Sequence, residues 1–179
     1  MQFIQTPLKD AFIIEVTPFQ DERGYFFRSF CEKEFAENGL PSSFPQCNFS
    51  YNYQKGTLRG LHFQHPPLAE GKLVRAIEGK IFDVIIDLRK ESPTYLQHIS
   101  VELSKENKKS LFVPAGFAHG FQCLEDNSTV FYQMTNFYDA NYQDGIHWND
   151  PTLAIQWPIE KKIISERDNN FGYVETYSS

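Results

Sequence analysis

Short runs of β-branched, aromatic and aliphatic residues follow one another along almost the whole chain, each separated from the next by turn residues. Such runs, spaced regularly and with almost no helical periodicity between them, indicate an all-β sandwich or barrel. The predicted strands are 11–16, 25–31, 46–52, 57–64, 72–78, 80–88, 97–103, 110–113, 119–124 and 129–137.

One short helix is predicted at 32–38, where Gly39 and Pro41 end it. The lone Gly79 between runs 72–78 and 80–88 predicts a hairpin. Because no Pro-, Gly- or Ser-rich linker divides the chain, we expect one domain over 1–179, with a polar and loosely held tail from Asn169.

The composition supports β structure and restricts the partners. The 17 Phe, 9 Tyr and 2 Trp suit pleated, half-buried surfaces. A net charge of −6 argues against nucleic acid or an anionic membrane as partner, although a few basic groups can still bind a phosphorylated substrate locally. With no apolar run long enough for a bilayer and three unpaired cysteines (Cys31, Cys47 and Cys123), we expect a cytoplasmic protein with reduced thiols.

Three parts of the sequence carry candidate chemistry. Strand 57–64 contains Arg59 and His62, which alternation places on opposite faces, so both reach one cavity only if the strand twists or bulges. Segment 114–121 delivers His119 at the start of a strand. Tyr132 lies in an apolar strand, and Asp168 ends a Ser-x-x-Asp segment.

Asp83 interrupts the apolar run 81–87, which is predicted to be a central strand buried on both faces. A buried carboxylate without a partner is costly, so Asp83 is expected to be paired or functional.

The pattern Pro-x-Gly-x-x-His at 114–119, with the histidine strand at 56–62, resembles the two signature motifs of the cupin superfamily. Metal-binding cupins carry His-x-His in the first motif, whereas this chain has His62-Phe63-Gln64, and Glu70 lies too far along. Zinc and iron favour three or four convergent ligands, so no metal is expected.

Without a metal or other cofactor, these residue types can still invert a carbon next to a ketone. Histidine is the natural general base near neutral pH, and an aspartate on its other nitrogen raises its basicity. A lysine stabilises the enolate oxygen, and a tyrosine returns a proton to the opposite face. This combination points to epimerisation.

From about Phe3 to Asp168 the chain resembles the dTDP-4-dehydrorhamnose 3,5-epimerases, which act on nucleotide-linked 4-keto-6-deoxy sugars. The resemblance implies a cupin jelly roll (a double-stranded β-helix) and a homodimer that exchanges N-terminal strands. The matching segments, in order and at the family's spacing, are 21–26, 46–50, 58–64, 71–74, 82–84, 92–94, 114–121, 145–150 and the Ser-x-x-Asp at 165–168.

The resemblance also implies roles by position. His62 would be the base for C3 and C5, with Asp168, and in a second place Asp83, supporting it. Lys72 would stabilise the enolate at the C4 oxygen, and Tyr132 would be the acid on the opposite face. The residues that would hold the substrate are Gln46, Asn48, Arg59, Asp83, His119 and Tyr138, with Phe19 and Arg23 supplied by the partner subunit.

The chain departs from the family pattern at Arg28, Cys47 and Glu70, where Glu, Asp and Gln are usual. Arginine only donates hydrogen bonds, and cytosine offers an acceptor at N3 where thymine offers a donor. Arg28 therefore predicts either a CDP-linked substrate or a side chain turned to solvent or phosphate.

Several alternatives remain open at this point. Epimerases specific for C3 or for C5 share the same residue set. A 3,4-ketoisomerase, a non-catalytic sugar-nucleotide-binding cupin and a metal-dependent cupin oxygenase use the same fold. Each residue also has a structural interpretation: His62 and Tyr132 as core side chains, Lys72 and Arg23 as surface ones.

Overall fold

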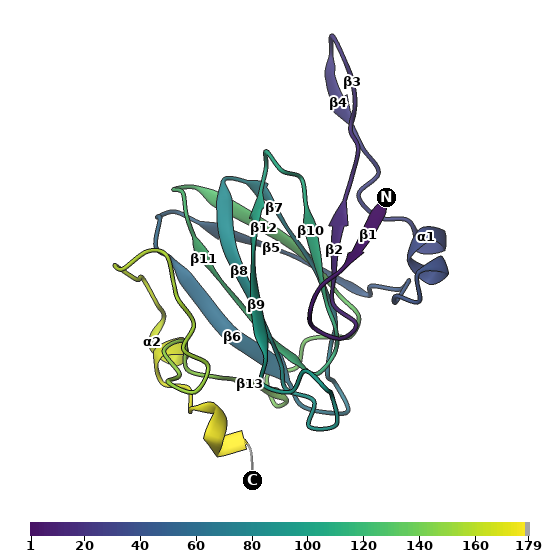
Figure 1. Cartoon of the computed structure of the whole chain (residues 1–179). Helices are drawn as coiled ribbons and strands as arrows, with labels where there is room; N and C mark the ends of the chain where they lie inside the picture. Colours follow the sequence, from purple (N-terminus) through teal and green to yellow (C-terminus); the bar gives the residue numbers. More distant parts are fainter. Residues whose placement is uncertain (178–179) are drawn as a thin grey trace.

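A computed structural model describes residues 1–177, and residues 178–179 lie outside the described part. Two antiparallel sheets face each other, and a separate two-stranded hairpin projects from them (Figure 1). The six-stranded sheet has the order β1 (Gln2–Gln5), β2 (Phe12–Glu15), β10 (Ser110–Val113), β7 (Lys72–Glu78), β12 (Ser128–Met134), β5 (Gln46–Asn52). The five-stranded sheet has the order β13 (Gln143–Gly145), β6 (Leu58–Gln64), β11 (Phe117–Cys123), β8 (Lys80–Asp87), β9 (His98–Ser104).

The remaining elements are short. The projecting hairpin pairs β3 (Phe19–Asp21) with β4 (Gly24–Phe26). The helical elements are α1 (Glu32–Glu37), α2 (Glu166–Asn169) and the 3-10 turn η1 (Val174–Tyr177). This arrangement confirms the predicted all-β jelly roll, and α1 is the short helix that the sequence predicted. In the described part of the chain, no helix is long and apolar enough to cross a membrane.

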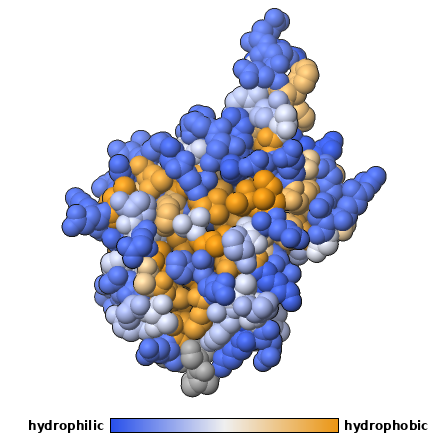
Figure 2. Space-filling model, viewed as in Figure 1, coloured by the Kyte–Doolittle hydropathy of each residue, from blue (hydrophilic) through white to orange (hydrophobic). Residues whose placement is uncertain are grey.

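The main core lies between the two sheets, where inward side chains alternate with outward ones along each strand. Val74 and Leu111 of one sheet pack with Ile85 and Phe121 of the other. A second cluster joins the outer face of β8 to the C-terminal segment, with Ile86 and Ile146 fully buried. The strand β8 is therefore buried on both faces, as its continuous apolar run predicts. Apolar side chains also extend across the middle of the surface in Figure 2.

The hairpin predicted at Gly79 is wrong. β7 pairs with β10 and β12, whereas β8 pairs with β9 and β11 in the opposite sheet. Gly79 has a φ of +65°, and a Cβ there would collide with Ser128. The glycine thus turns the chain from one sheet to the other. A glycine between two strands specifies a reversal, but the faces to be buried decide which sheet each strand joins.

The predicted strand 25–31 also ends early, since β4 stops at Phe26. Phe30 instead packs edge-on against Phe35 of α1 and Phe44, in a small aromatic cluster. Burial of this ring against a helix, and not strand pairing, explains the apolar pattern there. The elements that sequence reasoning missed are β1, β3, β13, α2 and η1.

Arg59 and His62 reach the same side of the sheet because β6 is irregular. Its register against β11 shifts by one residue between the pairs His119–His62 and Phe121–Arg59. Gly60 has a φ of +112°, and a Cβ there would lie 2.7 Å from the Cα atom of Gly120. Only glycine permits this close approach of two backbones, which reverses the phase of the strand.

The C-terminal segment is better held than expected. The backbone N–H of Val174 donates to Asp150 at 2.6 Å, and its side chain is buried. The ring of Phe171 lies against His62. The expectation of a loose tail from Asn169 therefore does not hold for these two residues.

Candidate active site

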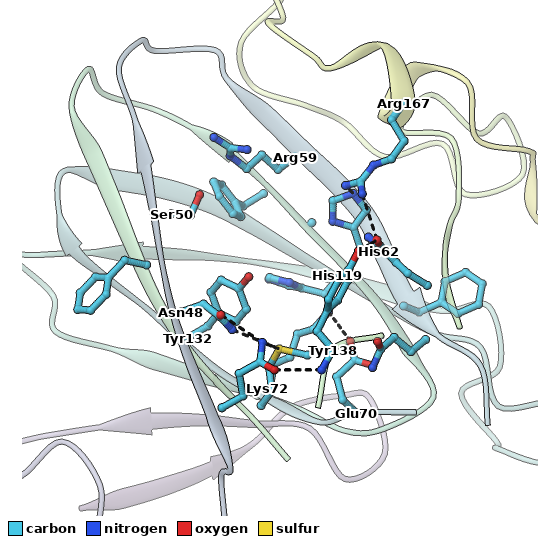
Figure 3. A pocket seen from close by; sticks show the side chains of 18 of the residues that line it. Asn48, Ser50, Arg59, His62, Glu70, Lys72, His119, Tyr132, Tyr138 and Arg167 are labelled. Atoms are coloured by element: carbon cyan, nitrogen blue, oxygen red, sulfur yellow. Dashed lines mark hydrogen bonds and ion pairs between the residues drawn. The ribbon is translucent and has the colours of Figure 1, made fainter. Parts of the chain in front are cut away.

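A cavity of about 580 Å³ lies between the two sheets and is open on one side. Strands β5, β7 and β12 of one sheet and β6 and β11 of the other supply most of its lining (Figure 3). Eight residues predicted for the site line it: Gln46, Asn48, Arg59, His62, Lys72, His119, Tyr132 and Tyr138.

His62 is supported from behind by Asp168. Its Nε2 atom lies 2.9 Å from Asp168 Oδ1, while Asp168 Oδ2 accepts the backbone N–H of Gly60 at 3.0 Å. The short helix α2 fixes Asp168, whose own N–H donates to the Ser165 hydroxyl at the helix start. Because a carboxylate only accepts, Nε2 carries the hydrogen and Nδ1 keeps its lone pair for use as a base.

The ionisation of this pair suits a base near neutral pH. Burial lowers the pKa of His62, and the positive charges of Lys72 and Arg167 act in the same direction, although Asp168 opposes them. Burial would raise the pKa of Asp168, but the hydrogen bonds from His62 and Gly60 and the charge of Arg167 lower it to about 2. At neutral pH the pair is therefore a neutral imidazole hydrogen-bonded to a carboxylate.

Tyr132 lines the same cavity from the opposite sheet. It lies on β12, while His62 lies on β6 (Figure 3). Burial raises the pKa of the Tyr132 phenol, with a smaller lowering contribution from Arg59. The phenol therefore keeps its proton at neutral pH, as an acid must. Among the described residues its hydroxyl has no recorded hydrogen-bond partner, so it is available to a ligand.

Lys72 opens β7 at the base of the cavity and is buried, which makes the surface interpretation wrong. Its ammonium lies 2.9 Å from Glu70 Oε1, and the two side chains are 8% and 3% exposed. A buried, paired ammonium is a fixed donor that can stabilise negative charge on an oxygen in the cavity.

His119 has its own aspartate. Its Nε2 atom lies 2.8 Å from Asp83 Oδ1, and Asp83 is completely buried. Asp83 is thus paired, as expected for its strand, but it supports His119 and not His62. It lies behind His119 and is not among the residues that line the cavity, so a contact between Asp83 and substrate stays a prediction.

Polar side chains on β5 form another wall. The Gln46 side-chain amide donates to Asn48 Oδ1 at 3.2 Å, and Gln46 Oε1 accepts a hydrogen bond from the backbone N–H of Tyr138. The guanidinium of Arg59 is held by the Asn52 side chain at 2.7 Å. The side-chain amides of Gln46 and Asn48 also contact the Met134 sulfur. The contact of Arg59 uses only its Nε atom, and a guanidinium has further N–H groups that suit phosphate oxygens.

Sequence reasoning missed Arg167 and Gln143, which also line the cavity. Arg167 Nη1 donates to Gln143 Oε1 at 3.0 Å, and Tyr138 Oη donates to the same oxygen at 2.6 Å. The position of Arg167 next to Asp168 was an available signal, whereas nothing in the sequence around Gln143 points to a site.

Asp168 and Asp83 lie behind the two histidines, and three further predicted residues also lie outside the cavity lining. Phe19 and Arg23 project on the β3–β4 hairpin, where Phe19 is 71% exposed and Arg23 pairs with Asp21. Arg28 forms an ion pair with Glu34 at 3.2 Å. Within one chain, therefore, Arg28 does not face the site. Recognition of a cytosine base by Arg28 stays a prediction.

Among residues 1–177, no three His, Cys, Asp or Glu side chains are grouped so that they could hold an ion.

Comparison with known proteins identifies the relatives of this chain. The family model described as dTDP-4-dehydrorhamnose 3,5-epimerase matches residues 5–175. The enzyme of that name from Methanothermobacter thermautotrophicus is 50% identical over 173 residues, which cover 95% of this chain and 92% of that one.

Solved structures agree. The dTDP-4-dehydrorhamnose 3,5-epimerase of Elizabethkingia anophelis superimposes with a TM-score of 0.96 at 42% identity, covering 100% of this chain and 99% of that one. An epimerase of Legionella pneumophila in complex with dTDP-4-keto-L-rhamnose gives 0.92 at 41% identity, covering 97% and 93%. On this sequence and structural evidence, the chain belongs to the dTDP-4-dehydrorhamnose 3,5-epimerase family.

Proposed function

We propose that this enzyme inverts C3 and C5 of a dTDP-linked 4-keto-6-deoxyhexose, using His62 as base and Tyr132 as acid. The observation that carries the proposal is the placement of a neutral, aspartate-backed imidazole and a protonated phenol on opposite sheets around one cavity. The names of the relatives support the choice of substrate.

In the proposed step, His62 Nδ1 takes the proton from the carbon next to the ketone. The electrons of that C–H bond form the enolate, whose negative charge develops on the C4 oxygen beside the Lys72 ammonium. Tyr132 then donates its hydroxyl proton to the opposite face of the same carbon. The imidazolium and phenolate that result return to their starting states by exchanging protons with water, so no other reactant is consumed.

The remaining cavity residues are proposed to bind the rest of the substrate. Arg59 and Arg167 would hold the diphosphate, because guanidinium groups match phosphate oxygens. His119, Gln46 and Asn48 would hydrogen-bond the sugar and phosphate, and the exposed ring of Tyr138 would stack on the base.

The test is turnover in heavy water with dTDP- and CDP-linked 4-keto-6-deoxyglucose. We expect two deuterons in the product, at C3 and C5, and a preference for the dTDP substrate. One deuteron would mean a single epimerisation, and a 3-keto product would mean a ketoisomerase. A preference for CDP would restore the role predicted for Arg28. No exchange with either substrate would contradict the proposal.

We further propose a homodimer in which the β3–β4 hairpin enters the partner subunit's site. Phe19 and Phe26 are 71% and 74% exposed on this hairpin, and Phe49 on the edge strand β5 is 70% exposed. Large exposed rings favour burial against another chain. Light scattering should give twice the 20.8 kDa mass of the chain, and Phe19→Asp should shift the protein towards the monomer. A monomeric unmodified chain would contradict the proposal.

We also place the enzyme in the cytoplasm. Its three cysteines are free thiols, which a reducing compartment maintains. Fractionation of the producing cell tests this, and recovery with an oxidising compartment would exclude it.

A further inference from the structure

Glu70 carries a polar atom that the rest of the described chain leaves unsatisfied. Its Oε1 atom pairs with Lys72, but its Oε2 atom is buried and has no hydrogen-bond partner among the described residues. Leaving a buried carboxylate oxygen without a donor is unfavourable, because the oxygen has lost its water. A donor that arrives with a ligand would remove this cost.

Glu70 is placed to meet such a ligand. It lines the same cavity as His62, Lys72 and Tyr132, and it lies at the base of the cavity beside Lys72 (Figure 3). Its negative charge contributes to the raised pKa of the Tyr132 phenol, after the larger effect of burial, which places it near the reacting groups. The carboxylate therefore belongs to the cavity lining and has one oxygen still without a donor.

The chemistry of the sugar identifies the donor. If Lys72 contacts the C4 oxygen, the Glu70 carboxylate bonded to Lys72 lies beside the carbons that flank C4. Of these, C5 bears a methyl group and the ring oxygen, neither of which donates a hydrogen bond. C3 bears a hydroxyl group, which does.

We propose that Glu70 is a substrate-binding residue that accepts a hydrogen bond from the C3 hydroxyl of the hexose while it holds Lys72 in place. This inference rests on the proposed function. It adds a contact that depends on the configuration at C3, one of the two carbons to be inverted. The C3 hydroxyl changes direction on inversion, so Glu70 would bind the two C3 epimers unequally. The usual glutamine at this position would instead present a neutral amide.

The experiment is a binding cycle with two unreactive ligands, dTDP-6-deoxyglucose and its 3-deoxy analogue. Both lack the ketone and are not turned over, so calorimetry reports binding alone. We expect the wild type to bind the 3-hydroxy ligand about 10-fold more tightly, as suits a hydrogen bond to a charged acceptor. In Glu70→Gln, which keeps an oxygen for Lys72 but loses the charge, the ratio should fall to about threefold or less.

The matched control is Glu78→Gln. Glu78 lies at the far end of β7 and forms an exposed ion pair with Lys105 at 3.2 Å. This variant should show the wild-type ratio. Equal affinity of the wild type for both ligands, or an unchanged ratio in Glu70→Gln, would overturn the inference. If Glu70→Gln does not fold, the affinities of the wild type for the two ligands still test the inference, because equal affinities would overturn it.

Deuterium exchange by the same wild-type preparation separates the two proposals. If the enzyme exchanges both protons but the binding cycle shows no coupling between Glu70 and the 3-hydroxyl, only the role proposed for Glu70 is contradicted. If the enzyme exchanges neither proton, the proposed function is contradicted, whatever the binding cycle shows.

Discussion

Replacement of His62 by alanine is expected to lower kcat by about 10³-fold and to stop deuterium uptake at both C3 and C5. The His62 imidazole is neutral and is oriented by Asp168, and a positioned base contributes about 10²–10⁴-fold. Binding of dTDP should be unaffected, because residues other than His62 are proposed to hold the thymine base and the phosphates. Rapid-quench turnover and calorimetry measure the two effects.

The control is His65→Ala. His65 follows β6 directly and also pairs with an aspartate, Asp144, at 3.0 Å, but it is half exposed and lies outside the cavity lining. It should retain near-wild-type turnover. Equal losses in the two variants would indicate a structural role for His62.

The pH profile of the wild type gives a second readout. Burial lowers the pKa of His62 in the folded protein, so kcat/KM should rise with pH with its midpoint below the ordinary histidine pKa of about 6.5. The folded protein favours the neutral form of His62. The resulting contribution to the free energy of unfolding is fully present above pH 6.5, and it is lost as the pH falls through the lower pKa of the folded state. Asp168, with a pKa of about 2, stays ionised throughout.

Replacement of Tyr132 by phenylalanine is expected to lower kcat for epimerisation by about 10²-fold while leaving proton removal in place. The ring remains to fill its position on β12, but the proton for the opposite face is gone. His62 can still remove a proton and return a deuteron to the same face. The variant should therefore exchange deuterium into substrate faster than it forms epimer, the reverse of the wild type.

This ratio distinguishes an acid from a packing residue. Nuclear magnetic resonance of the reaction in heavy water measures exchange and epimer formation in one sample. Tyr173→Phe, at an exposed tyrosine outside the cavity lining, is the control. Exchange and epimerisation that fall by the same factor in Tyr132→Phe would show that the phenol is not the acid.

Much of the fold was accessible from local sequence. Runs such as Gln46–Asn52 and Lys72–Glu78 predicted strands with the observed bounds, and along Gln46–Asn52 the more and less buried side chains alternate as a strand requires. The strand partners were not accessible: Gly79 predicted a turn, but β7 and β8 enter different sheets. Sheet membership depends on which distant faces cover one another.

The same division holds for the site. Residue types and their order were enough to predict a base, an acid, a lysine and an aspartate, and so an epimerase. The resemblance already implied that Asp168 supports His62, and the structure brings the two together across 106 positions of sequence. Only the structure assigned Asp83 to His119, across 36 positions. It also brought Arg59 to the side of His62 through the register shift at Gly60, and it left one oxygen of Glu70 without a donor. Local sequence determines which strands can form and which groups can react, whereas contacts between distant strands determine which groups meet.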